Sequence, residues 1–516
     1  MIFAFYAAAT FIGALTHEIW FDEAQAWCII RDNDIAGILQ VLQYEGHPPL
    51  WYLVLYPFAK LGAPCTVMPF ISWTISCVTV ALILWRAPFG LLLKACVVFS
   101  SGFFFYNSVT SRVYCLIPLI LLFIAELYPQ RRKHPILYGA MIALLANTHV
   151  IMCGLVGILG IFMLIDLFKE WKASSKKENA MKLAGLATAA VGVLLLVLPL
   201  LASLSLNNEV TALQHSPYLI ASRFVTALTE ISGKLFVFES ENMAVYLALS
   251  IMATAMLLFI VVMRHYRRGF AMTAVFSLMF IVVTQIVYNR IQTTRAAVFV
   301  YTMFFILWIS KKNEQPVRTD YRYEPESVNM ISRIISKVTD WDKNCEKSAA
   351  VLLSFILAAS VPRAVSALIF DYTSEYALSA STAEYIESEL PTDSIFVLVY
   401  NNGVRQISAY APQLEFYSLY HECRITHTVR YKCDEYPDWN AVYADLAEYP
   451  NVYLLHVYGG DRDLEFSNAV YSADTDCREF ILAKTADIFE IDIDKHILPY
   501  AGTQTDISTV LKGIMQ

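Results

Sequence analysis

The sequence predicts an all-α polytopic membrane bundle of about eleven helices, followed by a small α/β domain at the C-terminal end. Hydrophobic residues make up 57% of the 516-residue chain and charged residues only 16%, well below the roughly 25% of soluble domains. The charges are also divided: residues 1–370 contain 29 basic and 21 acidic residues, whereas residues 371–516 contain 9 and 24. This composition excludes a disordered chain, and no basic stripe indicates binding to nucleic acid.

Eleven apolar runs are candidate membrane-spanning helices, because about 20 apolar residues cross the hydrocarbon core of a bilayer. The first run is short, and a cleaved signal peptide is the alternative for it. The absence of a preceding basic residue disfavours that alternative. The runs cover approximately residues 1–16, 66–86, 91–108, 113–128, 135–148, 150–168, 183–205, 243–263, 270–288, 296–310 and 348–370.

Lysine and arginine are concentrated in every second loop of this arrangement. One set of loops contains 21 basic residues, eight of them in the loop 311–347, and the opposite set contains 7. Cytoplasmic loops carry the excess of Lys and Arg, so the N-terminus and the loop 311–347 are expected in the cytoplasm. The loop 17–65 and the acidic domain 371–516 are then extracytoplasmic, on either side of a last spanning helix at 348–370. The compact size and the absence of an organelle signal favour a bacterial plasma membrane.

Two β-rich runs predict the sheet of the C-terminal domain. Residues 394–400 (SIFVLVY) and 452–458 (VYLLHVY) are rich in residue types that favour strands. Residues 383–390 have helical character, and residues 490–494 alternate isoleucine with acidic residues as an exposed strand does. A domain of this length can fold on its own.

An acidic pair follows the first apolar run, at the membrane surface. Between Asp22 and Leu42 the apolar residues recur at helical spacing, which predicts two short interfacial helices broken and capped at residues 32–34. Carboxylates beside lipid are costly and usually have a function. Asp22 and Glu23 are therefore candidates for a general base or for ligands of a divalent cation such as Mg²⁺ or Mn²⁺. The alternative for the pair is a helix cap.

A second polar segment, residues 45–50 (EGHPPL), precedes the next apolar helix. Its prolines fix an extended backbone, and its glycine permits an unusual turn, so Glu45 and His47 would be held rigidly. Histidine is a frequent metal ligand, which makes His47 and Asp22 the candidate metal ligands. The alternative is a plain proline-led start to a helix over 51–61.

The acidic pair after the first span, followed some two dozen residues later by the HPPL segment, resembles the GT-C superfamily of membrane glycosyltransferases. The most similar members are the protein O-mannosyltransferases (the dolichyl-phosphate-mannose–protein mannosyltransferase family), the aminoarabinose transferases and related bacterial transferases. The similarity covers residues 1–310 in topology and 17–50 in motifs. The resemblance implies a GT-C-like fold, a polyprenyl-phosphate-linked sugar as donor, and Asp22 as the catalytic base with Glu23 beside it.

Other polar residues on the expected outer side fit a site for the donor phosphate. Arg112 and Tyr114 begin the fourth span, and Arg290 and Arg295 lie between the ninth and tenth spans. Arginine binds phosphate bidentately, and the alternative is that these side chains snorkel to lipid headgroups. Related bacterial sequences often have Arg-His at the last position, where this chain has Arg295-Ala296, so half of that motif is unfilled.

A histidine and an amide mark the expected outer turn between the fifth and sixth spans. Asn147 and His149 predict a polar cavity that supports the substrate, with a helix cap as the alternative. His215 and Glu230, in the loop 206–241, could contribute to the acceptor side. Asp32-x-Asp34 matches the metal-binding DxD of soluble transferases, but a turn explains this spacing better.

Together these residues predict an inverting membrane glycosyltransferase with 17–65 as its catalytic outer loop. It would move a hexose or pentose from a polyprenyl-phosphate donor to an extracytoplasmic glycan, lipid or protein, with membrane lipids as further partners. One alternative is a polysaccharide polymerase or ligase that uses lipid-diphosphate sugars, which the modest loop 206–241 disfavours. The other is a lipid-sugar flippase or transporter, for which matched halves are expected and not visible.

Overall fold

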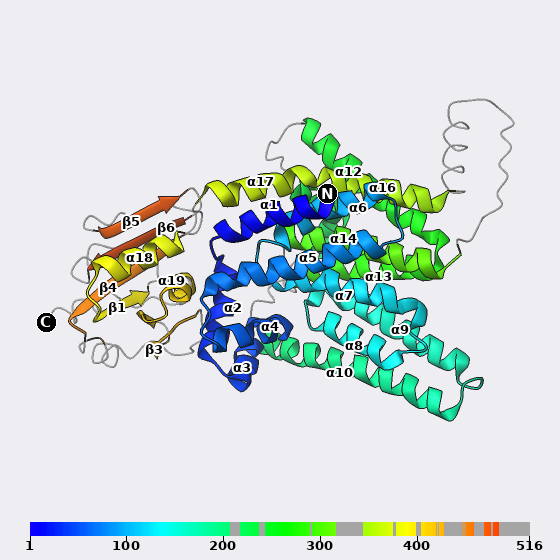
Figure 1. The fold of residues 1–516 in the computed structure, drawn as a ribbon, viewed down its shortest axis with the longest axis horizontal. Helices are drawn as coiled ribbons and strands as arrows, with labels where there is room; N and C mark the ends of the chain where they lie inside the picture. The colour runs from blue at the N-terminus through cyan, green and yellow to red at the C-terminus, as the bar shows by residue number, and fades with distance from the viewer. Residues whose placement is uncertain are drawn as a thin grey trace. The chain divides into compact units, whose positions relative to one another are not determined.

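The computed structural model is mostly helical (Figure 1) and separates the chain into two compact units. Unit 1 comprises Met1–Leu15, Gly46–Trp51 and Pro69–Phe370, and unit 2 comprises Thr16–Glu45, Tyr52–Met68 and Asp371–Gln516. The structure describes residues 1–206, 217–236, 243–288, 291–315, 344–374, 378–398, 404–418, 421, 423–427, 446, 449–458, 469–475 and 478–484.

Unit 1 is a helical bundle. Its α-helices are α1 (Ile2–Thr16), α5 (Met68–Arg86), α6 (Leu91–Phe99), α7 (Leu116–Leu127), α8 (Pro135–Ala146), α9 (Cys153–Glu170), α10 (Lys176–Leu206), α11 (Pro217–Leu235), α12 (Met243–Val262), α13 (Arg267–Val282), α14 (Thr293–Asn313), α16 (Cys345–Ala359) and most of α17 (Val361–Thr373). Among the described residues, eight helical stretches are long and apolar enough to cross a membrane, which makes this a multi-pass membrane protein.

Three of the eleven expected spans contain shorter helices. Helix α1 has 15 residues, α6 has 9 and α8 has 12. At 1.5 Å per residue, none of them alone reaches across a hydrocarbon core of about 30 Å. Helix α6 ends because the backbone of Ser100 is extended. Helix length therefore supports eight spans in the described residues, or nine if α1 and α2 (Phe21–Asp32) count together, and not the expected eleven.

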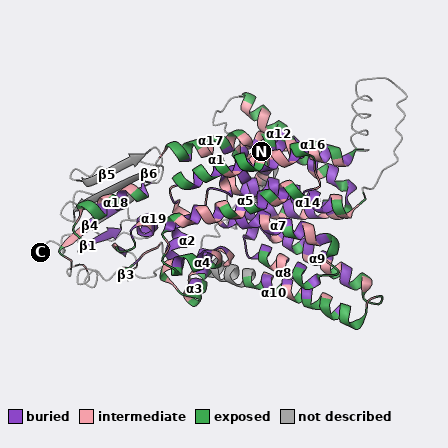
Figure 2. Ribbon diagram, viewed as in Figure 1, coloured by how far each residue is buried: buried purple, intermediate pink, exposed green. Residues whose placement is uncertain are grey.

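Several helices of the bundle have exposed apolar residues, whereas α14 is buried; Figure 2 colours the ribbon by burial. Leu194, Ile251 and Phe355 are about half exposed, as suits contact with lipid. In α14, by contrast, every residue from Arg295 to Ser310 is buried. A helix buried on all sides belongs inside a bundle, so α14 is the core of unit 1.

Helices α8 and α10 are in backbone contact through glycines. A Cβ on Gly139 would overlap the carbonyl oxygen of Gly185, and one on Gly192 would overlap Ala143. Small residues permit such close approach where apolar burial cannot drive helices together, as in a membrane. The glycines therefore explain why α8, although short, pairs closely with α10.

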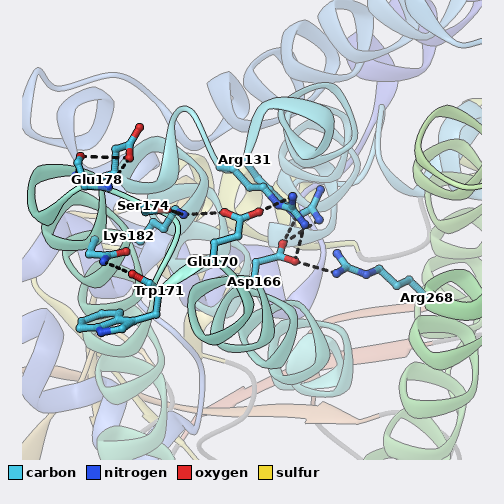
Figure 3. A network of polar contacts seen from close by, with 11 residues as sticks. Arg131, Asp166, Glu170, Trp171, Ser174, Glu178, Lys182 and Arg268 are labelled. Atoms are coloured by element: carbon cyan, nitrogen blue, oxygen red, sulfur yellow. Dashed lines mark hydrogen bonds and ion pairs between the residues drawn. The ribbon is translucent and has the colours of Figure 1, made fainter.

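Basic residues of the expected cytoplasmic loops hold carboxylates at the C-terminal end of α9 (Figure 3). Asp166 accepts from Arg131 at 2.8 Å, Arg132 at 3.0 Å and Arg268 at 2.8 Å. Glu170, one turn later, pairs with Lys182 at 2.6 Å. Asp166 is buried, and a buried carboxylate requires such partners.

Unit 2 combines a mixed sheet with helices from both ends of the chain. Its helices include α2 (Phe21–Asp32), α3 (Ile35–Glu45), most of α4 (Leu50–Lys60), α18 (Ser379–Glu389) and α19 (Val404–Tyr410), and its strands are β1 (Ser394–Leu398), β2 (Glu415–Ser418), β3 (Cys423–Arg424), β4 (Asn451–Tyr458), β5 (Ala469–Thr475) and β6 (Arg478–Lys484). The strand order is β3-β2-β1-β4-β6-β5. Strand β1 pairs in parallel with β2 and β4, and the other pairs are antiparallel.

The hydrophobic core of unit 2 lies between the sheet and its helices. Phe396, Phe416 and Tyr453 from three neighbouring strands pack with Ile386 of α18 and Ile407 of α19. The small sheet predicted from the sequence is thereby confirmed: β1 lies within the first β-rich run, and β4 covers the second and begins one residue before it. The expected strand at 490–494 lies outside the described residues.

Candidate functional sites

Glu23 is buried at the start of α2 in unit 2. Its Oε2 atom accepts the backbone N–H of Trp20 at 2.5 Å and lies 2.9 Å from Nε2 of His17. The side chain is 1% exposed. A glutamate that bonds back to the N-cap N–H is a common helix start, so Glu23 stabilises the local structure that carries its neighbour Asp22.

Asp22 is half-buried in the first turn of α2. The exposed backbone N–H groups and the macrodipole at this end of a helix stabilise a negative charge. The carboxylate is thus held on a regular helical backbone and keeps partial access to solvent. This position suits a base that receives a proton from an incoming acceptor.

His17 bridges two buried carboxylates within unit 2. Its Nε2 atom lies 2.9 Å from Glu23, and its Nδ1 atom lies 2.9 Å from Oδ1 of Asp371. All three side chains have at most 2% of their surface exposed. Burial disfavours the imidazolium, but the charges of Glu23 and Asp371 outweigh it and raise the pKa of His17 to about 10. Sequence reasoning missed both His17 and Asp371, although an acidic residue directly after the last apolar run is a visible signal.

Glu45 has a buried partner in the same unit. The amide nitrogen of Gln25 in α2 donates to Glu45 at the end of α3 over 2.8 Å. Glu45 is 8% exposed. This bond ties the two helices of the first loop together, and the backbone then turns at Gly46, whose φ of 65° favours glycine.

Unit 1 gathers six other polar and aromatic side chains, defined here as the cation–aromatic cluster: His47, Arg112, Tyr114, His149, Tyr288 and Arg295. The rings of Tyr114 and His149 are stacked with centroids 5.3 Å apart. His149 also contacts Tyr288 at 5.7 Å and His47 at 6.4 Å between ring centroids. The structure therefore brings together four residues predicted for substrate or phosphate binding with His47.

Two guanidinium groups lie over the tyrosines of the cluster. The carbon of the Arg295 guanidinium is 3.6 Å from the ring centroid of Tyr288, and that of Arg112 is 5.4 Å from the ring of Tyr114. Arg295 is only 7% exposed. Arginine stacks favourably on aromatic faces and leaves its N–H groups at the edge to bind an anion.

His149 is neutral in this setting. It lies in the turn between α8 and α9, where Nδ1 accepts the N–H of Ile151 at 3.2 Å. Its Nε2 atom, 3.3 Å from the Tyr114 hydroxyl, then carries the proton and donates it to that oxygen. Burial and then the charges of Arg295, His47 and Arg112 lower the pKa of His149 well below its usual range. The same two arginines give the cluster a positive potential, which attracts an anion.

The cluster is built where helices are interrupted. A π-helical turn at Val283–Val287 leads to Tyr288, and 3₁₀ turns at Val113–Cys115 and Val150–Met152 follow Arg112 and His149. Irregular backbone at membrane depth is tolerated where it lines a cavity or is buried in protein, and π-turns are frequent at functional sites.

The remaining predicted residues have less direct roles. The Asn147 amide donates to the carbonyls of Ala143 and Gly192, as a helix-capping residue does. Glu230 accepts from the Gln285 amide and the Ile291 N–H. Arg290 and His215 lie outside the described residues. Within the described residues, no three His, Cys, Asp or Glu side chains gather to hold a metal ion; of the two candidate ligands, Asp22 belongs to unit 2 and His47 to unit 1.

Comparison with other proteins adds no family assignment. No protein-family model matches the sequence, and no curated protein sequence matches it significantly. The functional argument therefore depends on the residues themselves.

Proposed function

We propose that the protein is an inverting glycosyltransferase of the GT-C type that uses a polyprenyl-phosphate-linked sugar as donor. The observation that supports this most is the cation–aromatic cluster in unit 1. It offers two arginines, a tyrosine hydroxyl and a neutral histidine within a bundle of apolar helices. This is the chemistry that the phosphate of a membrane-embedded lipid needs, with its chain among the helices.

The cluster also suits the charge changes of the reaction. When the acceptor attacks the anomeric carbon, the bond from that carbon to the phosphate oxygen breaks and the phosphate leaves with the electron pair. Arg112 and Arg295 would stabilise the developing charge on this leaving group. The hydroxyl proton of Tyr114 is a third donor, because its oxygen already accepts the N–H of His149.

Asp22 is the proposed base. It would take the proton of the acceptor hydroxyl or amine as the new glycosidic bond forms. Its assignment depends on the resemblance in the first loop and on its half-buried position in the first turn of α2. In the proposed topology the N-terminus is cytoplasmic, and transfer takes place outside the plasma membrane of a bacterium onto a glycan, lipid or protein. A Mg²⁺ or Mn²⁺ ion could assist the phosphate.

Release of free undecaprenyl phosphate by purified full-length protein tests the proposal. Undecaprenyl-phosphate hexoses would be offered with membrane lipids and glycans as acceptors. We expect release that falls at least 100-fold in Asp22→Asn and in Arg295→Gln. Arg86→Gln is the matched control, because Arg86 is half exposed and pairs with Glu126 at 2.9 Å.

Three outcomes would contradict the assignment. Full activity in Asp22→Asn would remove the proposed base. Release only from lipid-diphosphate sugars would favour a polymerase or ligase. Binding of the donor without any release would favour a flippase or transporter.

A further inference from the structure

The first loop is bonded to the C-terminal domain at several points within unit 2. The Glu18 carboxylate accepts the N–H of Ser379 at the start of α18 over 2.6 Å. The N–H of Ile19 donates to the Tyr410 hydroxyl at 2.8 Å, and Arg31 donates to the side chain and carbonyl of Ser408. These contacts flank the segment that carries Asp22.

The buried contact in this set is the triad of His17, Glu23 and Asp371. Both ring nitrogens of His17 lie 2.9 Å from carboxylate oxygens. A neutral imidazole has one N–H and can donate to only one of them. Two hydrogen bonds at this spacing therefore require one proton more than a neutral imidazole and two carboxylates carry. The simplest arrangement is an imidazolium between two carboxylates. Removing one member of a buried ion group leaves an uncompensated charge, which is strongly destabilising.

Among the described residues, the charges that act on His17 come from two carboxylates. Glu23 faces it from α2 and Asp371 from α17, and these are the charged groups that act on it. Near Glu23, the Tyr410 hydroxyl accepts the N–H of Ile19, and burial, with smaller contributions from Glu18 and Glu23, raises the pKa of Tyr410. The carboxylates of Glu23 and Asp371 both favour protonated His17, and the cation of Arg405, on α19, lies over the ring of Phe21 in α2.

We propose that His17 is a positioning residue that holds the first turn of α2, and with it Asp22, against the start of the C-terminal domain. This inference rests on the proposed function for the role of Asp22. The C-terminal domain is then a scaffold for the catalytic loop. Because Glu23 bonds both to His17 and to the Trp20 N–H, loss of His17 loosens the helix start directly.

Hydrogen exchange and kinetics on the full-length protein test this together. In His17→Gln we expect the amides of residues 20–24 to exchange at least tenfold faster. We also expect kcat to fall at least tenfold, with the KM for undecaprenyl-phosphate hexose within twofold. His134→Gln is the matched control, because His134 is exposed in a turn of unit 1, and both readouts should stay unchanged.

The exchange and kinetic measurements distinguish failure of the proposed function from failure of the positioning role. Faster exchange in His17→Gln together with an inactive wild-type protein would overturn the proposed function and the role for Asp22, while the triad would stand as a structural fastening. Unchanged exchange, or faster exchange with unchanged kcat, would overturn the positioning role. If His17→Gln does not fold, ¹⁵N-histidine spectra of the wild-type protein test the triad instead, because they show whether a histidine ring is protonated on both nitrogens. We expect a doubly protonated ring to persist at pH 8.5, and its absence among the ten histidines would overturn the proposal.

Discussion

The cation–aromatic cluster of unit 1 and the His17 triad of unit 2 both contain a buried histidine, but its charged neighbours are cationic in the cluster and anionic in the triad. Both place polar groups inside a protein that is mostly apolar. The triad satisfies each ring nitrogen with a carboxylate. The cluster instead surrounds a neutral histidine with cationic groups stacked on aromatic rings. A closed ion group stabilises a fold, whereas a site with excess positive potential is suited to a ligand.

The largest expected difference between the two regions is in stability. Asp371→Asn leaves the His17–Glu23 pair in place but removes one charge from the buried triad. We expect the free energy of unfolding to fall by about 3 kcal/mol, as for other broken buried ion pairs. Chemical unfolding of the full-length protein in detergent would measure it. A loss below about 1 kcal/mol would mean that the charges of His17, Glu23 and Asp371 do not stabilise one another in the folded protein.

The pH dependence of stability is a second test of the ion pairs in the triad. The folded-state pKa of His17 is raised to about 10, above the value of about 6.5 in an unfolded chain. Its contribution is therefore complete below pH 6.5, decreases as the pH rises, and is lost above pH 10. We expect the stability difference between wild type and His17→Gln to follow this course. A difference that is constant from pH 6 to pH 10.5 would contradict the raised pKa.

A smaller stability change is expected in the cluster. Tyr288→Leu removes the ring beneath Arg295 and with it a cation–π contact of about 1 kcal/mol. We expect that loss in unfolding free energy, accompanied by weaker binding of undecaprenyl phosphate. Isothermal titration and unfolding on the same sample would measure both. If Tyr288→Leu lowered the unfolding free energy as much as Asp371→Asn, the cluster would stabilise the fold as strongly as the triad, and the proposed difference between the two regions would be wrong.

The smallest stability change is expected at Arg112. The side chain is half-buried and lies over Tyr114. Arg112→Gln should alter the unfolding free energy by less than about 0.5 kcal/mol, because the side chain is outside the packed core, yet weaken binding of undecaprenyl phosphate about tenfold. Unchanged binding would indicate that Arg112 contacts lipid headgroups and not the donor phosphate.

Sequence patterns predicted the local structure of the first loop closely. Two helices were expected with a break at residues 32–34, and α2 ends at Asp32 while α3 begins at Ile35. The proline-led helix after the HPPL segment is α4. These features depend on spacing, capping and proline, which act over a few residues. The number of spans was harder, because hydropathy does not reveal an extended Ser100 or a helix of 12 residues.

The groupings of polar residues were predictable only in part. Arg112, Tyr114, His149 and Arg295 were chosen by their expected side of the membrane, and they do lie in one cluster. Tyr288 gave no signal, since tyrosine is common near membrane interfaces. The His17–Asp371 pair joins residues 354 positions apart, and no local pattern can predict a contact of that separation.

The chain passes from one unit to the other five times, after residues 15, 45, 51, 68 and 370. Neither unit is therefore a continuous cassette that recombination could cut out and replace. An exchange of the C-terminal domain alone would separate it from residues 16–45 and 52–68, which belong to the same unit.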